Sequence, residues 1–520
     1  MRCFQFFCSV FAVLTAPDVY SVALAQDFQD ANPVFKEELK KSYTPFMTVH
    51  DVPKPLVVKN YTAPSSSQSE NEAAKADSFT FGTSGELSGD SIFGSSETPV
   101  VVQKQRYKPS LSGFVEVDAA YLPDRDSRSD VTAHVKVRPE GQWQINEHWS
   151  AKVAADIDHF IESGSNDFNK TEIRYNENYI RYGQDNFKVT VGAQKVIWGR
   201  VDGIKPTDQL GSQDFRTFIT DDYEDRRQAI PALRGEYFVG DYKIDGLFAF
   251  DFRATETADR DSIWSLIDVD RGRVIGFDSN PLISPVIQNA SFDEDDGGVG
   301  GGGVRVSKTG QVADFAFTAQ RVRRTLPFYE VNPDLISAVQ GGTLPAAALA
   351  ALNGATLTTR HPWSWVVGGD VAIPVGSTIL RAEGAWMSDV PVYTSTLTTD
   401  RVDSYMMVVG AEFYPGDGNL RVIIQGSAEI LPDADAVRNE IYSINGSIEQ
   451  ELAHGRWLVG MDYLVGLDEH DIYLNPKITF AGLDEHSLYI EGHYFDGSSE
   501  TVGGFFEDNS QIMAGWSYGF

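Results

Sequence analysis

Charged residues of both signs are concentrated in one segment, residues 198–227, which also contains Gly199 and Pro206. Basic residues recur at alternating positions of several runs elsewhere in the chain. Carboxylates that face arginines across a water-filled lumen create a transverse field, which discriminates solutes by charge and size. We therefore expect the segment to fold into a lumen and form a charged constriction; the alternative is an exposed loop whose charges are solvated. The residues expected in the constriction are Asp202, Asp208, Asp214, Arg216, Asp221, Asp222, Arg226 and Arg227 of the segment and Lys136, Arg138, Arg234, Arg381 and Arg421 of the runs.

Signals for other chemistry are weak. The chain has no His-Glu-x-x-His motif, and its two cysteines, Cys3 and Cys8, precede all the charged runs. His134 and His493 sit at expected inward positions, but polar residues in a lumen need no catalytic explanation. Asp293 to Asp296 form an oxygen-rich cluster of the kind that hard cations favour, yet the EF-hand spacing is absent and acidic runs are usually just solvated. We expect no enzymatic activity, no cofactor and no resident metal.

The elements that must position these charges are β-strands. From Tyr107 onward the chain consists of runs in which apolar and polar residues alternate, as in Val131, Ala133 and Val135 against His134 and Lys136. We count about 18 such runs, with 16 as the alternative, and no stretch of about 18 apolar residues that could form a transmembrane helix. The runs begin near Leu111, Val131, Ser150, Thr171, Asn186, Ala229, Tyr242, Gly301, Gln311, Ser364, Ser377, Val402, Asn419, Glu440, Arg456, Asp471, Ser487 and Asn509.

The links between these runs alternate in length. The even-numbered links are tight, for example residues 183–185, Gly240-Asp241 and residues 374–376, whereas several odd-numbered links are long, such as residues 199–228 and 254–300. Short turns on one rim and long loops on the other are typical of outer-membrane barrels, whereas alternation alone would also suit a soluble sandwich. The pattern therefore predicts an all-β fold: an antiparallel up-and-down transmembrane barrel with an even strand count.

The two ends of the chain point to the same compartment. Arg2 precedes a mainly apolar run, and Ala23-Leu24-Ala25 places small residues where signal peptidase requires them, so we expect a signal peptide over residues 1–25. Residues 26–105 include a stretch rich in Ser, Gly, Glu and Asp, which predicts a flexible periplasmic segment before a barrel over residues 106–520. In the last strand, Trp516, Tyr518 and Phe520 share one face.

These ends carry a family resemblance. The terminal aromatic strand resembles the C-terminal assembly signal of Gram-negative outer-membrane barrels, which implies a lipid bilayer and the barrel-assembly machinery as partners. A second resemblance is to large, poorly characterised proteobacterial porin-like barrels. Their pattern of Trp-Gly, Pro-Thr-Asp and Asp-aromatic-Arg is matched by Trp198-Gly199, Pro206-Thr207-Asp208 and Asp214-Phe215-Arg216. This second resemblance names no substrate.

The net charge of −31 argues against nucleic acid as a partner and mildly favours cationic or zwitterionic solutes. We expect an outer-membrane porin-like channel for small solutes. One alternative is a transporter of hydrophobic molecules, with residues 333–353 as an apolar gate, although this stretch also suits a small loop-packing helix. The other alternative is a plugged structural or adhesion barrel. The oligomeric state stays open.

Overall fold

The computed structural model describes residues 109–124, 128–164, 167–276, 284–288, 291–294, 297–332, 341, 357–394, 398–416, 418–432 and 435–520. The expected signal peptide and the segment of residues 26–105 lie outside this part of the chain, as does nearly all of residues 333–353. The acidic run from Asp293 to Asp296 is outside it too, apart from the backbone of its first two residues.

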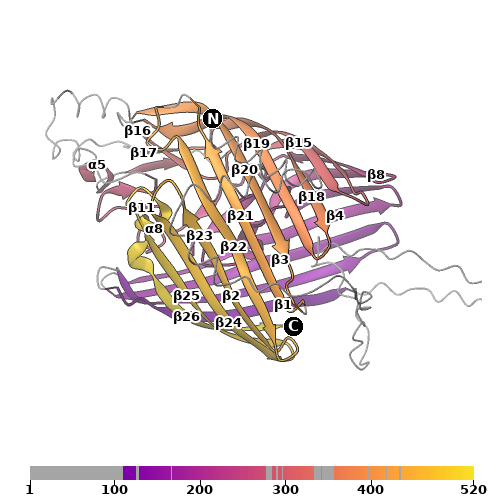
Figure 1. Ribbon diagram of the computed structural model, residues 1–520, viewed down its shortest axis with the longest axis horizontal. Coiled ribbons are helices and arrows are strands. Elements are labelled where there is room, and N and C mark those ends of the chain that lie inside the picture. The colour runs from indigo at the N-terminus through magenta and orange to yellow at the C-terminus, as the bar shows by residue number, and fades with distance from the viewer. Residues whose placement is uncertain are drawn as a thin grey trace, which may run out of the picture. The chain divides into compact units, whose positions relative to one another are not determined.

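A single closed sheet of 18 antiparallel strands forms the wall of a barrel (Figure 1). Each strand pairs with the next wall strand along the chain, and the sheet closes where β1 pairs with β26, from Phe114 opposite Gly519 to Tyr121 opposite Ile512. Closure leaves no open sheet edge, which in hydrocarbon would cost several kcal/mol for each unpaired backbone group. The predicted up-and-down barrel of 18 strands is confirmed.

The wall strands begin within three residues of the positions predicted from alternation. They are β1 (Ser110–Tyr121), β2 (Ser129–Gln144), β3 (Trp149–Gly164), β4 (Phe168–Gln184), β5 (Phe187–Gln194), β8 (Ile230–Val239), β9 (Tyr242–Ala249), β14 (Gly301–Lys308), β15 (Asp314–Arg323), β18 (Trp363–Val375), β19 (Thr378–Tyr393), β20 (Thr399–Phe413), β21 (Leu420–Ile430), β22 (Glu440–Leu452), β23 (Trp457–Gly466), β24 (Asp471–Leu483), β25 (His486–Gly497) and β26 (Gln511–Gly519).

Link lengths follow the expected parity. The even-numbered links contain two to six residues, whereas the links after β5, β9 and β15 run over residues 195–229, 250–300 and 324–362. Two of the tightest turns place Gly240 and Gly376 at φ values of 57° and 62°, a conformation that two-residue hairpins of right-handed twist require. All long links therefore emerge at one rim of the barrel, called here the long-loop rim.

The outer face of the wall is apolar and its inner face is polar, the reverse of a soluble β-sandwich. Ile173, Phe317 and Ile490 point outward and are 73%, 66% and 61% exposed, whereas inward-facing Lys136 and Asp158 are nearly inaccessible. A soluble sandwich buries its apolar face in a dry core, so this arrangement excludes that alternative. An apolar outer face around a polar interior is the distribution expected of a barrel in lipid. No helix in the described ranges has the length and hydrophobicity that a membrane crossing requires.

The long links carry the remaining elements, several of which gather at one end of the barrel (Figure 1). Three small sheets join β10 (Glu256–Thr257), β6 (Ser212–Phe215) and β7 (Arg227–Gln228); β11 (Ile267–Asp268) and β12 (Arg273–Val274); and β13 (Phe292–Glu294), β17 (Leu357–Arg360) and β16 (Phe328–Val331). The helical turns are α4 (Tyr223–Arg226), α5 (Ser284–Gln288), α8 (Val502–Phe505) and η1 (Glu507–Asn509).

Apolar residues of these links form a buried cluster, called here the loop cap. It includes Phe218 of the link after β5, Trp264 and Ile267 of the link after β9, and Phe506 of the last link. The rings of Phe218 and Phe506 are 4.3 Å apart, and those of Trp264 and Phe506 are 5.7 Å apart. Links that are distant in sequence are therefore packed together over the long-loop end of the wall.

Candidate functional site

Residues 195–229, called here the inner loop, leave the wall after β5 and rejoin it at β8. Trp198 and Leu210 of this loop share a buried apolar cluster with Val366 of β18 and Ala385 of β19. Five wall strands lie between β5 and β19 along the sheet, and four of them, β8, β9, β15 and β18, contribute to the same cluster. The first half of the inner loop therefore lies inside the barrel, packed on the far wall.

A single carboxylate on that far wall accepts several hydrogen bonds from the loop. Glu383 of β19, only 2% exposed, accepts hydrogen bonds from the backbone N–H groups of Arg200 at 2.7 Å and Thr207 at 2.8 Å, and from the Thr207 hydroxyl at 2.8 Å. A longer bond of 3.3 Å comes from the Val201 N–H. Gly199 has φ of 109°, and a Cβ there would stand 2.6 Å from Glu383 Oε1, so this position requires glycine.

Arginine pairs add to this attachment. Arg200 Nε lies 2.6 Å from Asp370 Oδ1 on β18, and the other Asp370 oxygen is 2.5 Å from Arg305 on β14. Asp202 accepts a 2.7 Å bond from Arg381 of β19. Arg381 also pairs with Glu412 of β20.

The second half of the inner loop contacts the opposite arc of the wall, β2 to β4. Asp214 Oδ2 is 2.7 Å from Arg174, and Arg216 lies 2.8 Å from Asp158 Oδ2 and 2.6 Å from Glu172 Oε2. Asp221 accepts a 3.1 Å bond from Lys136 of β2. Because both arcs hold the loop through charged pairs, it spans the lumen.

A neighbouring pair joins the end of the loop to the same arc. Asp225 of α4 lies 3.2 Å from an Arg138 guanidinium nitrogen, and the Nε of Arg138 lies 2.5 Å from Asp156 on β3. Asp225 was not among the residues predicted for the constriction. It brings the predicted Arg138 to the loop.

Several of the residues predicted for the constriction make their described contacts elsewhere than across the lumen. Asp208 and Arg227 pair with each other at 3.0 Å inside the loop, so they shape the loop and do not face the lumen. Arg234 pairs with Asp245 of the neighbouring strand at 2.5 and 2.9 Å, within the wall. Arg226 lies over the rings of Phe215 and Tyr223, at 5.6 and 5.7 Å.

Two predicted residues border the remaining open space. Arg421 Nε pairs with Glu412 at 2.7 Å, and its side chain lines a cavity of about 590 Å³ beside the inner loop. Asp222 is exposed and lines the same cavity. Arg421 and Asp222 do not form an ion pair with each other.

Inner-loop carboxyls differ in acidity. Burial by itself would raise the pKa of Asp214 and of Asp221, but hydrogen bonds and charge from Arg216 hold the pKa of Asp214 well below its usual range. The Lys136 charge likewise lowers the pKa of Asp221. For Asp222, enclosure by the surrounding wall prevails over the attraction of Lys477, so its pKa is raised.

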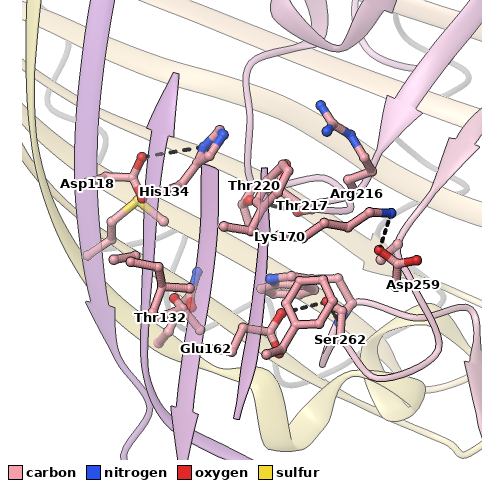
Figure 2. A pocket seen from close by; sticks show the side chains of 18 of the residues that line it. Asp118, Thr132, His134, Glu162, Lys170, Arg216, Thr217, Thr220, Asp259 and Ser262 are labelled. Carbon is pink, nitrogen blue, oxygen red and sulfur yellow. Dashed lines mark hydrogen bonds and ion pairs between the residues drawn. The ribbon is translucent and has the colours of Figure 1, made fainter. Parts of the chain in front are cut away.

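A smaller pocket marks where the inner loop and the link after β9 meet the wall. Figure 2 shows Arg216, Thr217 and Thr220 beside His134 and Glu162, with Asp259 and Ser262 closing the far side. Lys170 pairs with Asp259 at 2.6 Å, and the Ser262 hydroxyl donates to Glu162 at 2.6 Å. The pocket holds about 40 Å³, which accommodates a few waters but no organic solute.

One catalytic motif is matched by spacing alone. Gly515, Ser517 and Gly519 match the Gly-x-Ser-x-Gly spacing, but all three lie within β26, whereas a nucleophile elbow needs a strand-to-helix turn. His493 is buried beside Glu491 and Tyr473, with its Nδ1 3.0 Å from the Tyr473 hydroxyl. Within the described ranges no three His, Cys, Asp or Glu residues are grouped as a metal site.

Sequence reasoning missed Glu383, Asp158, Glu172 and Arg174 as partners of the loop. All four occupy inward positions of alternating strands, which is a signal that many residues share. The Trp-Gly, Pro-Thr-Asp and Asp-aromatic-Arg pattern was the better guide. Its Gly199 and Thr207 meet Glu383, its Asp208 pairs with Arg227, and its Asp214 and Arg216 reach the opposite wall.

No family model and no curated protein matches the sequence. Among solved structures, OmpF of Salmonella typhi in complex with daunomycin is 12% identical, with a TM-score of 0.40, over 80% of this chain and 98% of that one. The outer-membrane channel DcaP of Acinetobacter baumannii is 11% identical, with a TM-score of 0.38, over 80% and 98%. A loop-deletion mutant of OmpT, an outer-membrane protein of Vibrio cholerae, is 9% identical, with a TM-score of 0.36, over 80% and 99%. The 18-stranded barrel fold stands on this chain's own strand pairing.

Proposed function

We propose that the protein is an outer-membrane porin-like channel through which small solutes diffuse past the inner loop. The observation that carries this proposal is the two-sided attachment of the loop: Glu383 holds it on one arc of the wall, and Asp158 and Lys136 hold it on the other. A loop fixed in this way narrows a lumen without filling it. The cavity of about 590 Å³ beside it is within the size range of small-molecule sites.

The charges around the loop support selection by charge and size rather than catalysis. Loop carboxylates pair with wall arginines and loop arginines pair with wall carboxylates, as in Asp202 with Arg381 and Arg216 with Glu172, so charges of both signs border the narrowed section. Paired charges of this kind also keep the loop rigid, because breaking a buried pair leaves an uncompensated charge at a cost of about 3 to 5 kcal/mol. Diffusion through such a lumen requires no cofactor.

Outer-membrane assembly is part of the same proposal. Tyr518 and Trp516 stack with a ring separation of 6.4 Å, and Trp516 Nε1 donates to His486 at 3.2 Å. Phe520 closes the strand by exchanging backbone hydrogen bonds with Gly113 of β1, at 2.9 and 3.0 Å. We propose that this aromatic edge is what the barrel-assembly machinery recognises, with both termini on the periplasmic side and the short-turn rim beside them.

A plugged structural barrel is the second candidate, because the loop cap packs an apolar cluster over one end of the wall. Liposome swelling separates the two. Liposomes that contain the purified, folded protein should swell in isotonic solutions of small sugars and amino acids, and swelling should slow as solute size increases. Liposomes that exclude every solute down to the smallest would favour the plugged barrel.

A further inference from the structure

The cavity beside the inner loop has a one-sided charge. It lies between Asp222 and Asp225 of the loop and the inward faces of β21 to β26 and β1. Six carboxylates line it, against two cationic side chains, Arg421 and Lys477. A cleft lined by one sign of charge with low-dielectric walls focuses the field and concentrates counter-ions.

The pairing of these groups sharpens the imbalance. Arg421 is already offset by Glu412 at 2.7 Å, and Lys477 by Glu491 at 3.3 Å, and neither of these carboxylates is among the lining residues. In contrast, the side-chain carboxylates of Asp222 and Asp462 form no ion pair or hydrogen bond with the residues that the structure describes, although the Asp222 backbone carbonyl accepts from Asp225 and Arg226. The same is true of Glu449, so the cavity keeps carboxylates available to a passing solute.

Lys477 shows how this wall receives an ammonium group. Its Nζ lies 4.8 Å from the centre of the Tyr489 ring and 3.3 Å from Glu491 Oε2. Tyr489 is itself oriented, because its hydroxyl donates to Glu116 at 2.7 Å. A carboxylate beside an aromatic face is the arrangement that binds alkylammonium ions, and here a side chain of the protein occupies it.

We propose that the channel prefers cations, in particular solutes bearing an ammonium group, and that Lys477 sets how strongly they are held. This inference rests on the proposed function and deepens it by assigning a solute class. Asp222 and Asp462 attract the cation into the cavity, and the Lys477 ammonium competes with it for Glu491 and Tyr489. Conduction requires binding that is strong enough for entry and weak enough for exit, and Lys477 provides the weakening.

The test is the zero-current potential of the full-length protein in planar bilayers under a KCl gradient at low salt. Exposed charges are screened within about 10 Å at 0.1 M salt, so the preference should be clear there and fall at 1 M. The expected potential corresponds to K⁺ preferred over Cl⁻ several-fold. D222N and D462N should each lower the ratio, and K477Q should raise it. The matched control is D403N, which removes an exposed carboxylate of β20 from outside the cavity.

Liposome swelling adds a second readout with three solutes of similar size, namely lysine, glutamine and glutamate. Lysine should enter fastest and glutamate slowest, and K477Q should enlarge that difference. A channel that conducts but prefers Cl⁻, or whose ratio D222N and K477Q leave at the D403N value, would overturn the inference and leave the channel function standing. A folded protein that neither conducts nor supports swelling would instead overturn the channel function itself.

Discussion

The Glu383 carboxylate accepts two hydrogen bonds from Thr207, one from its backbone N–H and one from its hydroxyl, both at 2.8 Å. Glu383 is on the barrel wall and Thr207 is on the inner loop, so these two bonds attach the loop to the wall. Glu383→Ala should release this half of the loop, because it removes the acceptor for the backbone N–H groups of Arg200, Val201 and Thr207. Each buried N–H group that is left without an acceptor costs about 1 to 3 kcal/mol. We expect a higher and noisier single-channel conductance.

The control for that variant is Glu440 to Gln, which changes an exposed carboxylate at the long-loop rim. It should conduct like the wild type. If E383A conducted with wild-type size and noise, Glu383 would not hold the loop.

Arg216 should be a stability determinant of the folded channel. Its guanidinium, largely buried, meets Asp158, Glu172 and Asp214, so truncation leaves three carboxylates close together. Arg216 to Ala should lower the free energy of unfolding by on the order of 3 kcal/mol. Urea unfolding of the detergent-solubilised barrel measures this. R253A is the matched arginine control, because Arg253 stacks on the Tyr175 ring at 4.2 Å, donates to backbone carbonyls at 2.8 and 3.3 Å, and has a carboxylate, Glu256, no nearer than 3.9 Å. Equal losses in the two variants would contradict the account.

Acidification should reduce the cation preference of the channel at a higher pH than the pH at which the inner loop detaches from the wall. The pKa of Asp222 is raised above its ordinary value of 3.8, so this carboxyl loses its charge at a higher pH than an ordinary aspartate. The pKa of Asp214 is lowered, so its contribution to stability is fully present above 3.8 and is lost only as the pH falls through the lower, folded-state value. Lowering the pH from 7 towards 4.5 should therefore reduce cation preference while conductance keeps its narrowed size.

That experiment is a pH series of zero-current potential and conductance on the same channels. D222N should flatten the first without altering the second. A conductance that rises together with the loss of selectivity would show that the loop detaches first, against this assignment.

Assembly should depend on the last aromatic residue. Deleting Phe520 removes the residue that closes β26 onto Gly113, so the folded barrel recovered from outer membranes should fall several-fold. Tyr405 to Ala removes an aromatic of comparable exposure from the outer face of β20 and serves as the control. Equal recovery of the two variants would mean that the terminal residue carries no assembly signal.

Most of the fold could be predicted from alternation, because the side chains of a strand point to opposite faces with a period of two. Trp516 and Tyr518 were placed on one face, and both lie opposite apolar Val117 and Val115 of β1. The alternating link lengths then required an even strand count, which the closure of β1 on β26 confirms.

The site was harder to predict for a physical reason. Alternation tells which face a residue occupies, but not its height in the barrel or its position around the wall. Arg234 was therefore grouped with Arg381 as inward-facing, although Arg381 pairs with Asp202 of the inner loop and Arg234 pairs with Asp245 of the wall. Glu383 is inward for the same reason as many other carboxylates, and only the path of the loop across the lumen singles it out.

The central claim is that the inner loop narrows an open lumen, and the direct measurement is single-channel conductance before and after deletion of residues 205–220. Heat-modifiable migration on gels would show that the shortened protein is still a folded barrel. We predict a conductance well above that of the wild type. An unchanged conductance in the folded deletion variant would contradict the claim.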